Sequence, residues 1–143
     1  MLNLAILGLG RWGQNLVESI EGSKTVRFSA AVTRTPSKVS AFCAQKNILL
    51  TYDYRLVLHD EAIDAVVIAT PHSLHFDQIM IAASAGKHVF CEKPFTLIAE
   101  QARIALASLA QHSLKVAIGH NRRCAPNTVA LKNDLKISSL GQP

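Results

Sequence analysis

The first thirteen residues decide the fold, because they join a short apolar stretch to a glycine-rich turn. Met1-Leu2-Asn3-Leu4-Ala5-Ile6-Leu7 predicts a strand, and Gly8-Leu9-Gly10-Arg11-Trp12-Gly13 has the spacing GxGxxG and opens a helical pattern. Gly8 suits a tight turn, Gly10 lets the backbone approach a pyrophosphate, and Gly13 lets the helix pack closely on the strand. Strand, turn and helix in this order predict a dinucleotide-binding unit.

Length and composition bound the class of protein. The chain has 143 residues, enough for one domain with a real core, and 49% of them are hydrophobic, which excludes general disorder. No apolar run approaches the roughly 18 residues that a membrane span needs, and the N-terminus lacks a signal-type segment. We therefore expect a cytoplasmic protein with no membrane partner.

Cysteines and charge also narrow the possibilities. Cys43, Cys91 and Cys124 form no CxxC, so buried or half-buried free thiols are expected rather than a disulfide scaffold. The net charge of +5 comes from lysines and arginines that are scattered singly, apart from Arg122-Arg123. Because there is no basic stripe with interleaved aromatics, we expect an anionic small molecule as the partner rather than nucleic acid.

The rest of the chain alternates stretches of strand length with helical patterns. Within the helix predicted at 97–111, Ile98 and Leu106 belong to an apolar set at helical spacing and are expected in the core. The order of elements predicts an α/β fold with a doubly wound parallel sheet. Strands are predicted at 1–7, 26–32, 48–50, 64–69, 88–91 and 115–118, and helices from the glycine turn to Ile20, from Pro36 to about Lys46, at 54–58, from the 70–75 segment to Gly86, at 97–111 and from Pro126 to Leu140.

The end of the second predicted strand bears on the cofactor. NAD-binding folds commonly place an Asp or Glu there to accept hydrogen bonds from the ribose hydroxyls. This chain has Thr33-Arg34-Thr35-Pro36 instead, and the Arg34 guanidinium can pair with a 2′-phosphate. The stretch favours NADP over NAD, with a solvated loop arginine as the alternative.

Two histidines follow the fourth predicted strand, in Thr70-Pro71-His72-Ser73-Leu74-His75. They could form half of a metal site, but we find no set of further ligands at suitable spacing and predict no metal. Both imidazoles are instead expected at a helix start beside the cofactor, with His75 the better candidate to touch it.

A charged pair leaves the fifth predicted strand, where His88-Val89-Phe90-Cys91 runs into Glu92-Lys93-Pro94. A surface loop with a salt bridge is one interpretation. The other is an amine at the mouth of the nucleotide crevice, where a lysine can move protons. Chemically distinctive residues thus follow most of the predicted strands, at the carboxyl edge of the sheet where doubly wound folds bind ligands.

With these motifs the chain resembles the Gfo/Idh/MocA family, that of glucose–fructose oxidoreductase and inositol 2-dehydrogenase. The motifs span the whole chain in the family's order, and Glu-Lys-Pro is the most specific of them. They are the glycine turn at 8–13, Ala69-Thr70-Pro71 followed by His75, Ala85-Gly86-Lys87-His88-Val89, Glu92-Lys93-Pro94, and Asn121-Arg122-Arg123 with Pro126.

The resemblance implies roles for single residues. Lys93 would lie beside the nicotinamide and the reacting carbinol and assist proton transfer, Glu92 would contact the nicotinamide ribose, and Pro94 would be a cis proline. The family's substrates are mostly sugars, inositols and related secondary alcohols, which exchange hydride with NAD or NADP. With Lys93 catalytic, the residues expected to bind the cofactor are Gly8, Gly10, Arg11, Trp12, Gly13, Thr33, Arg34, Thr70, Pro71, His72, His75, Glu92, Pro94, Arg122 and Arg123.

Two departures from the family pattern matter. Cys124 stands at a position that is often aromatic, which would loosen that wall of the cleft. Family members also continue for roughly another domain, which binds the substrate. We therefore expect residues 1–124 to form the NAD(P)-binding domain, and residues 125–143 to form a terminal helix and the start of a linker to an absent C-terminal domain.

Two functions fit these residues equally well. One is the cofactor domain of an NAD(P)-dependent oxidoreductase that acts on a sugar-like or polyol substrate. The other is a truncated nucleotide-binding module with no catalysis of its own, serving as a sensor or interaction protein. Apolar surface that a second domain would cover predicts self-association, and we expect a homo-oligomer.

Overall fold

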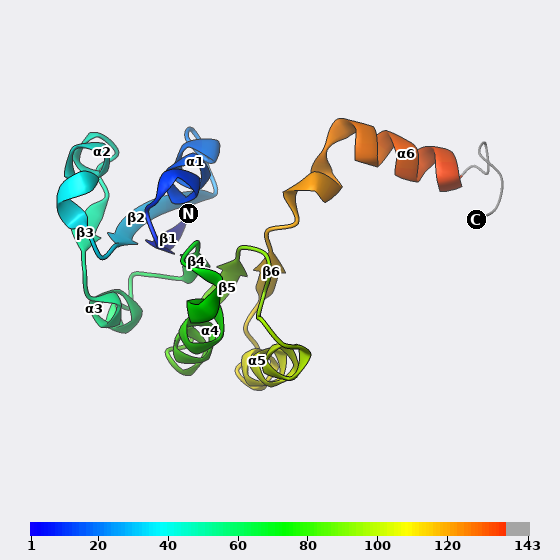
Figure 1. Ribbon diagram of the computed structural model, residues 1–143. Coiled ribbons are helices and arrows are strands. Elements are labelled where there is room, and N and C mark those ends of the chain that lie inside the picture. The colour runs from blue at the N-terminus through cyan, green and yellow to red at the C-terminus, as the bar shows by residue number, and fades with distance from the viewer. Residues whose placement is uncertain (137–143) are drawn as a thin grey trace.

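Six parallel strands form one sheet in the order β3-β2-β1-β4-β5-β6 (Figure 1). The structure is a computed structural model that describes residues 1–136. The predicted α/β class with a doubly wound parallel sheet is confirmed. The strands are β1 Leu2–Leu7, β2 Val26–Val32, β3 Leu49–Thr51, β4 Ala65–Ile68, β5 His88–Cys91 and β6 Val116–Ile118.

The helix predicted from Pro36 to Lys46 is split. Val39 has φ −129° and ψ 7°, which is not helical, and its side chain is buried in the core. Tertiary packing of this residue therefore overrides the local helical pattern. The predicted extension of the last helix to Leu140 lies outside the described residues. The helices are α1 Arg11–Ser19, α2 Ser40–Gln45, α3 Tyr54–His59, α4 His75–Ser84, α5 Ala99–Gln111 and α6 Pro126–Lys136, with 3₁₀ turns η1 Pro36–Lys38, η2 His72–Leu74 and η3 Asn121–Cys124.

Side chains of the central strands alternate between two cores, because successive residues of a strand point to opposite faces. In β1, Ile6 packs in one cluster with Val17 of α1 and Cys43 of α2. Its neighbour Leu7 packs in the other cluster, which includes Ile79 of α4. Helices α1 and α2 thus cover one face of the sheet, and α3, α4 and α5 cover the other (Figure 1).

The β6 end of the sheet is less covered than the sequence predicts. Ile98 and Leu106, expected in the core, are 58% and 45% exposed. Ile98 precedes α5 as its N-cap residue, and α5 itself packs on the core through Ala105 and Leu109, with Ala102 partly buried beside them. Helix α6 stands beyond β6, away from the sheet (Figure 1), and its residues 126–135 are all exposed.

The direction in which the sheet grows reverses between β1 and β4. The chain runs from β1 outward to β2 and β3, then returns to β4 beside β1 and continues to β5 and β6. Doubly wound folds bind ligands at the carboxyl ends of the strands near such a point. The glycine turn after β1 and the Thr70 loop after β4 leave the sheet there.

Candidate functional site

The three glycines of the turn have different physical reasons to lack a side chain. Gly8 has φ +93°, and a Cβ added to it would lie 2.6 Å from the Ala69 carbonyl oxygen. A Cβ on Gly13 would collide with the Gly8 carbonyl oxygen. The protein's own packing therefore requires both glycines.

Gly10 is not required by the packing of the protein. Its φ is an ordinary −74°, and apart from Gly10 itself and its two chain neighbours no protein heavy atom lies within 4 Å of the position of an added Cβ. This open space lies at the N-terminus of α1, where backbone N–H groups lack partners within the helix. The turn therefore fits the close approach of a pyrophosphate.

A cavity of about 840 Å³ opens at the ends of β1, β2 and β4, and we call it the β2-side cavity. Gly8 and Gly10 line it, together with Thr33 and Arg34 from the end of β2. The Arg34 side chain is exposed, so its guanidinium can reach a bound anion. Sequence reasoning missed several lining residues, whose place depends on strand order rather than on a local motif: Tyr52, Tyr54, Leu74, Asp77, Gln78 and Ile81.

A second cavity of about 460 Å³ lies at the ends of β4 and β5 and beside η3, and we call it the β5-side cavity. Ala69 and Thr70 line both cavities, which are therefore neighbouring halves of one crevice along the carboxyl edge of the sheet. Of its lining residues, Ala69 and Asn121 were not among the expected site residues. The full lining is Trp12, Ala69, Thr70, His72, Glu92, Lys93, Asn121 and Arg122.

Glu92 and Lys93 differ in exposure. Glu92 is buried, and its Oε2 accepts a 3.3 Å hydrogen bond from the Lys93 backbone N–H. The Lys93 side chain is exposed at the β5-side cavity. Among residues 1–136 the Lys93 ammonium forms no ion pair.

The structure corrects the expectation that His75 touches the cofactor. His75 has no exposed surface, its Nδ1 lies 2.8 Å from the Pro94 carbonyl oxygen, and its Nε2 lies 3.0 Å from the Thr70 carbonyl oxygen. Each ring nitrogen thus faces a backbone carbonyl oxygen, and the two carbonyls belong to different loops. The Lys93–Pro94 peptide bond is cis, as the resemblance implied.

Four other expected cofactor contacts lie outside both cavities: Arg11, Gly13, Pro94 and Arg123. Gly13 is buried within the turn, whereas Arg11 and Arg123 are exposed. Pro71, by contrast, lines the β2-side cavity, and His72 lines the β5-side cavity. Contacts between these residues and a cofactor stay predictions.

The cysteines are free thiols, as expected, although Cys124 is exposed rather than buried. Burial, together with the nearby charge of Glu92, raises the pKa of the Cys91 thiol to about 12. Burial also raises the pKa of Cys43. Both thiols therefore stay protonated at neutral pH and are poor nucleophiles.

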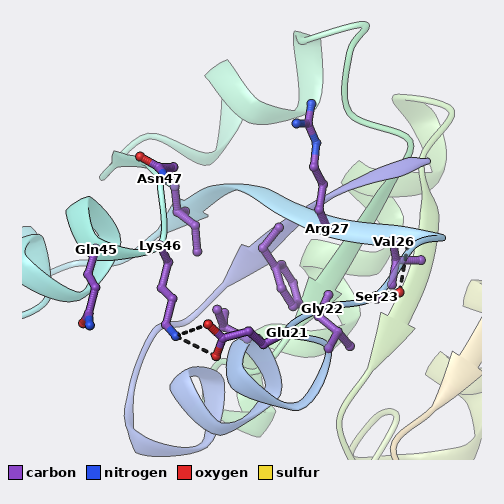
Figure 2. A pocket seen from close by; sticks show the side chains of 12 residues that line it. Glu21, Gly22, Ser23, Val26, Arg27, Gln45, Lys46 and Asn47 are labelled. Carbon is purple, nitrogen blue, oxygen red and sulfur yellow. Dashed lines mark hydrogen bonds and ion pairs between the residues drawn. The ribbon is translucent and has the colours of Figure 1, made fainter.

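A third cavity, of about 290 Å³, lies at the opposite end of β2 and contains none of the expected site residues (Figure 2). Figure 2 shows the Lys46 ammonium pointing to the Glu21 carboxylate, at 2.8 Å. This pair joins the end of α2 to the segment after α1. We assign no ligand to this cavity.

Neither a metal cluster nor a membrane segment is found in the described part of the chain. Residues 1–136 hold no group of three His, Cys, Asp or Glu side chains placed for a metal ion. None of the helices within these residues has the length and apolar character to cross a membrane.

Comparison with known proteins decides the family. A model of an oxidoreductase family with an NAD-binding Rossmann fold matches residues 2–120. The chain belongs to the Gfo/Idh/MocA family. The family and the NAD-binding Rossmann domain expected from the sequence are thereby confirmed.

Individual Gfo/Idh/MocA relatives extend the comparison. The chain is 34% identical to scyllo-inositol 2-dehydrogenase (NAD(+)) of Bacillus subtilis over 143 residues, covering 97% of this chain and 41% of that protein. It is 26% identical over 136 residues to scyllo-inositol 2-dehydrogenase (NADP(+)) IolU of the same organism, covering 94% and 42%. The solved structure of scyllo-inositol dehydrogenase from Lactobacillus casei with bound NAD(H) and scyllo-inositol is similar with a TM-score of 0.91 and 29% identity, covering 99% and 43%. The chain thus spans 41 to 43% of the length of these proteins.

Proposed function

We propose that this chain is the cofactor domain of an NAD(P)-dependent oxidoreductase that exchanges hydride with a secondary alcohol or carbonyl of a sugar, inositol or related polyol. One observation carries the proposal: the glycine turn and Lys93 line two cavities that share Ala69 and Thr70. Two adjoining cavities along the carboxyl edge of a doubly wound sheet match the two halves of a dinucleotide.

Each part of a dinucleotide has candidate partners in the crevice. The space at Gly10 and the N-terminus of α1 would hold the pyrophosphate. Thr33 and Arg34 would bind the adenosine ribose or its 2′-phosphate, and Glu92 would accept a hydrogen bond from the nicotinamide ribose. The relatives include an NAD(+) enzyme and an NADP(+) enzyme, and Arg34 favours NADP for this chain.

Lys93 would handle the proton of the reaction. When bound, the nicotinamide supplies the hydride exchange. Oxidation of an alcohol also releases its hydroxyl proton, and reduction of a carbonyl takes one up. Lys93 would accept the proton in one direction and donate it in the other. Because the ammonium forms no ion pair within residues 1–136, no salt bridge has to break first.

Further residues of the β5-side cavity suit a hydroxyl-rich substrate. Asn121 and Arg122 offer hydrogen-bond donors, and the Trp12 indole, 45% exposed, offers an apolar wall. Sugars and inositols present both hydroxyl groups and C–H faces. Scyllo-inositol, for which these relatives are named, is of this class.

The second candidate function is a nucleotide-binding module that does not catalyse a reaction. The observation that favours it is that both cavities are lined by residues between 7 and 122, so these residues by themselves offer a site for a nucleotide. Under the first proposal, residues 1–124 would form the cofactor domain and residues 125–143 the connection to a substrate-binding domain.

The exposed apolar residues Val129, Leu131 and Leu135 of α6 would favour self-association into a homo-oligomer. Sedimentation at micromolar concentration tests this expectation. A cytoplasmic location stays a prediction.

Calorimetric titration of the folded chain with NADH and NADPH tests the proposal. Saturable binding of either supports a cofactor domain, and a folded chain that binds neither would overturn it. The chain has a single tryptophan, and Trp12 lines the β5-side cavity, so energy transfer to a bound dihydronicotinamide gives an independent signal. Turnover with scyllo-inositol, myo-inositol or glucose then separates an enzyme from a module that only binds.

A further inference from the structure

His75 contacts two loops whose residues line the β5-side cavity. Its Nε2 lies 3.0 Å from the carbonyl oxygen of Thr70, which lines that cavity. Its Nδ1 lies 2.8 Å from the carbonyl oxygen of Pro94, the residue directly after Lys93. The ring itself is fully buried and cannot reach a ligand.

The two contacts depend on which nitrogens of the imidazole carry a proton. A carbonyl oxygen only accepts hydrogen bonds, so the ring donates to both carbonyls at once only with a proton on each nitrogen, and with a single proton it donates to one of them. The sulfur of Cys91 lies 3.3 Å from Nδ1 and belongs to a thiol that stays neutral because its pKa is raised to about 12. The local polar partners of the ring are thus two loop carbonyls and an uncharged thiol.

We infer that His75 is a positioning residue, which ties the Pro94 carbonyl to the Thr70 carbonyl and so fixes Lys93 and Thr70 on the walls of the β5-side cavity. The inference rests on the proposed function, because it gives this cavity to the nicotinamide half of the cofactor. His75 then acts through Lys93 and Thr70 and touches neither cofactor nor substrate.

Three substitutions separate the two contacts. His75→Asn keeps an amide donor near the position of Nδ1 and so retains the bond to Pro94, whereas His75→Gln keeps one near Nε2 and so retains the bond to Thr70. His75→Leu fills the space without a donor. His59→Gln, at an exposed position on α3 outside both cavities, is the matched control.

The first experiment needs no ligand. Hydrogen exchange of the free chain should accelerate in residues 69–74 and 93–97 of His75→Leu, while exchange in β1 and β4 stays at the parental rate. In His75→Asn the 93–97 segment should stay protected and the 69–74 segment should exchange faster. Parental exchange in both loops of His75→Leu would overturn the inference whatever the chain binds.

The second experiment compares NADH with ADP-ribose, which lacks the nicotinamide. His75→Leu should lower the affinity for NADH about tenfold, in the range of one lost hydrogen bond to a well-placed donor, and leave the affinity for ADP-ribose unchanged. Energy transfer from Trp12 to the dihydronicotinamide should fall with it, and His75→Asn should restore more of both signals than His75→Gln.

The outcomes distinguish this inference from the proposed function. A parent chain that binds neither ligand contradicts the proposed function, and the exchange experiment still decides whether His75 ties the loops. A parent that binds both ligands, with the same affinity ratio in all His75 variants, overturns the inference alone. Equal losses for both ligands without rescue by His75→Asn indicate a general packing role and also overturn it.

Discussion

The carboxylate of Glu92 occupies the space that a side chain on Gly119 would need. A Cβ added at Gly119 would lie 2.5 Å from Oε1 and 2.9 Å from Oε2 of Glu92. Gly119 directly follows β6, and its N–H donates a 2.8 Å hydrogen bond to the Cys91 carbonyl oxygen. The ends of β5 and β6 therefore meet around a buried carboxylate at the β5-side cavity.

Substitution Gly119→Ala should displace the Glu92 carboxylate. We expect a loss of about 1–3 kcal/mol in the free energy of unfolding, as for overpacking, and weaker binding of NADH relative to ADP-ribose. Denaturant unfolding and calorimetry measure the two effects. The double variant Gly119→Ala/Glu92→Ala provides the control, because removal of the carboxylate makes room for the methyl group. Strictly additive losses of stability would contradict a shared space.

Gly10→Ala and Gly13→Ala should separate the needs of the ligand from those of the fold. No protein heavy atom beyond its chain neighbours lies within 4 Å of a Cβ at Gly10, so Gly10→Ala should change stability by less than about 1 kcal/mol but weaken nucleotide binding at least tenfold. Gly13→Ala collides with the Gly8 carbonyl oxygen and should instead lower the unfolding midpoint. Unchanged NADH affinity in Gly10→Ala would show that the pyrophosphate does not bind at this turn.

The sequence predicts the glycine turn well because its signal is local. Strand, turn and helix are contiguous, and the atoms that require Gly8 and Gly13 to lack a side chain belong to the same motif or to the loop after the adjacent strand β4. The position of His75 could not be predicted in the same way. Whether this ring faces a ligand or two carbonyls depends on how the Thr70 and Pro94 loops fold over it, and these loops follow different strands.

Two other features also depend on tertiary packing. Val39 lies inside a helical pattern but breaks the helix, because its side chain is drawn into the core between α1 and α2. Tyr52 lines the β2-side cavity only because β3 lies beside β2. No sequence motif surrounds either residue. Periodicity therefore predicted the elements, while the strand order decided which loops share a cavity.

Arg34 should set the preference between NADPH and NADH. Its exposed guanidinium lies at the β2-side cavity, where it can make charge-assisted hydrogen bonds to a 2′-phosphate. We expect Arg34→Ala to lower NADPH affinity about 10- to 100-fold and to leave NADH affinity nearly unchanged. Arg55→Ala, an exposed arginine on α3 outside the cavities, is the control. If both affinities stay parental in Arg34→Ala, Arg34 is a solvated loop residue.

Lys93 should affect turnover rather than cofactor binding. In a protein that carries the substrate-binding domain, Lys93→Met should bind NADH within about twofold of the parent but lose about 10²- to 10⁴-fold in kcat, the range for a general acid or base. Lys93→Arg keeps the charge but cannot release a proton at working pH. Steady-state kinetics across pH compare the variants. An active Lys93→Arg enzyme would assign Lys93 an electrostatic role in place of proton transfer.

The raised pKa of Cys91 predicts a loss of stability in alkali. The thiol would lose its proton near pH 9.0 in the unfolded chain, whereas the folded chain holds it until about pH 12. Between these values the unfolded chain binds fewer protons, so the free energy of unfolding falls as pH rises. By pH 10.5 this group alone should cost the parent about 2 kcal/mol relative to neutral pH.

Comparison with Cys91→Ala isolates this contribution, because all other titrating groups are shared. Denaturant unfolding between pH 7 and 10.5 should show a steeper decline for the parent than for Cys91→Ala. Cys124→Ser, which changes an exposed thiol, should keep the parental slope. Parallel curves for the parent and Cys91→Ala would mean that the thiol ionises in the folded chain, and that the packing of Cys91 against His75 is open to water.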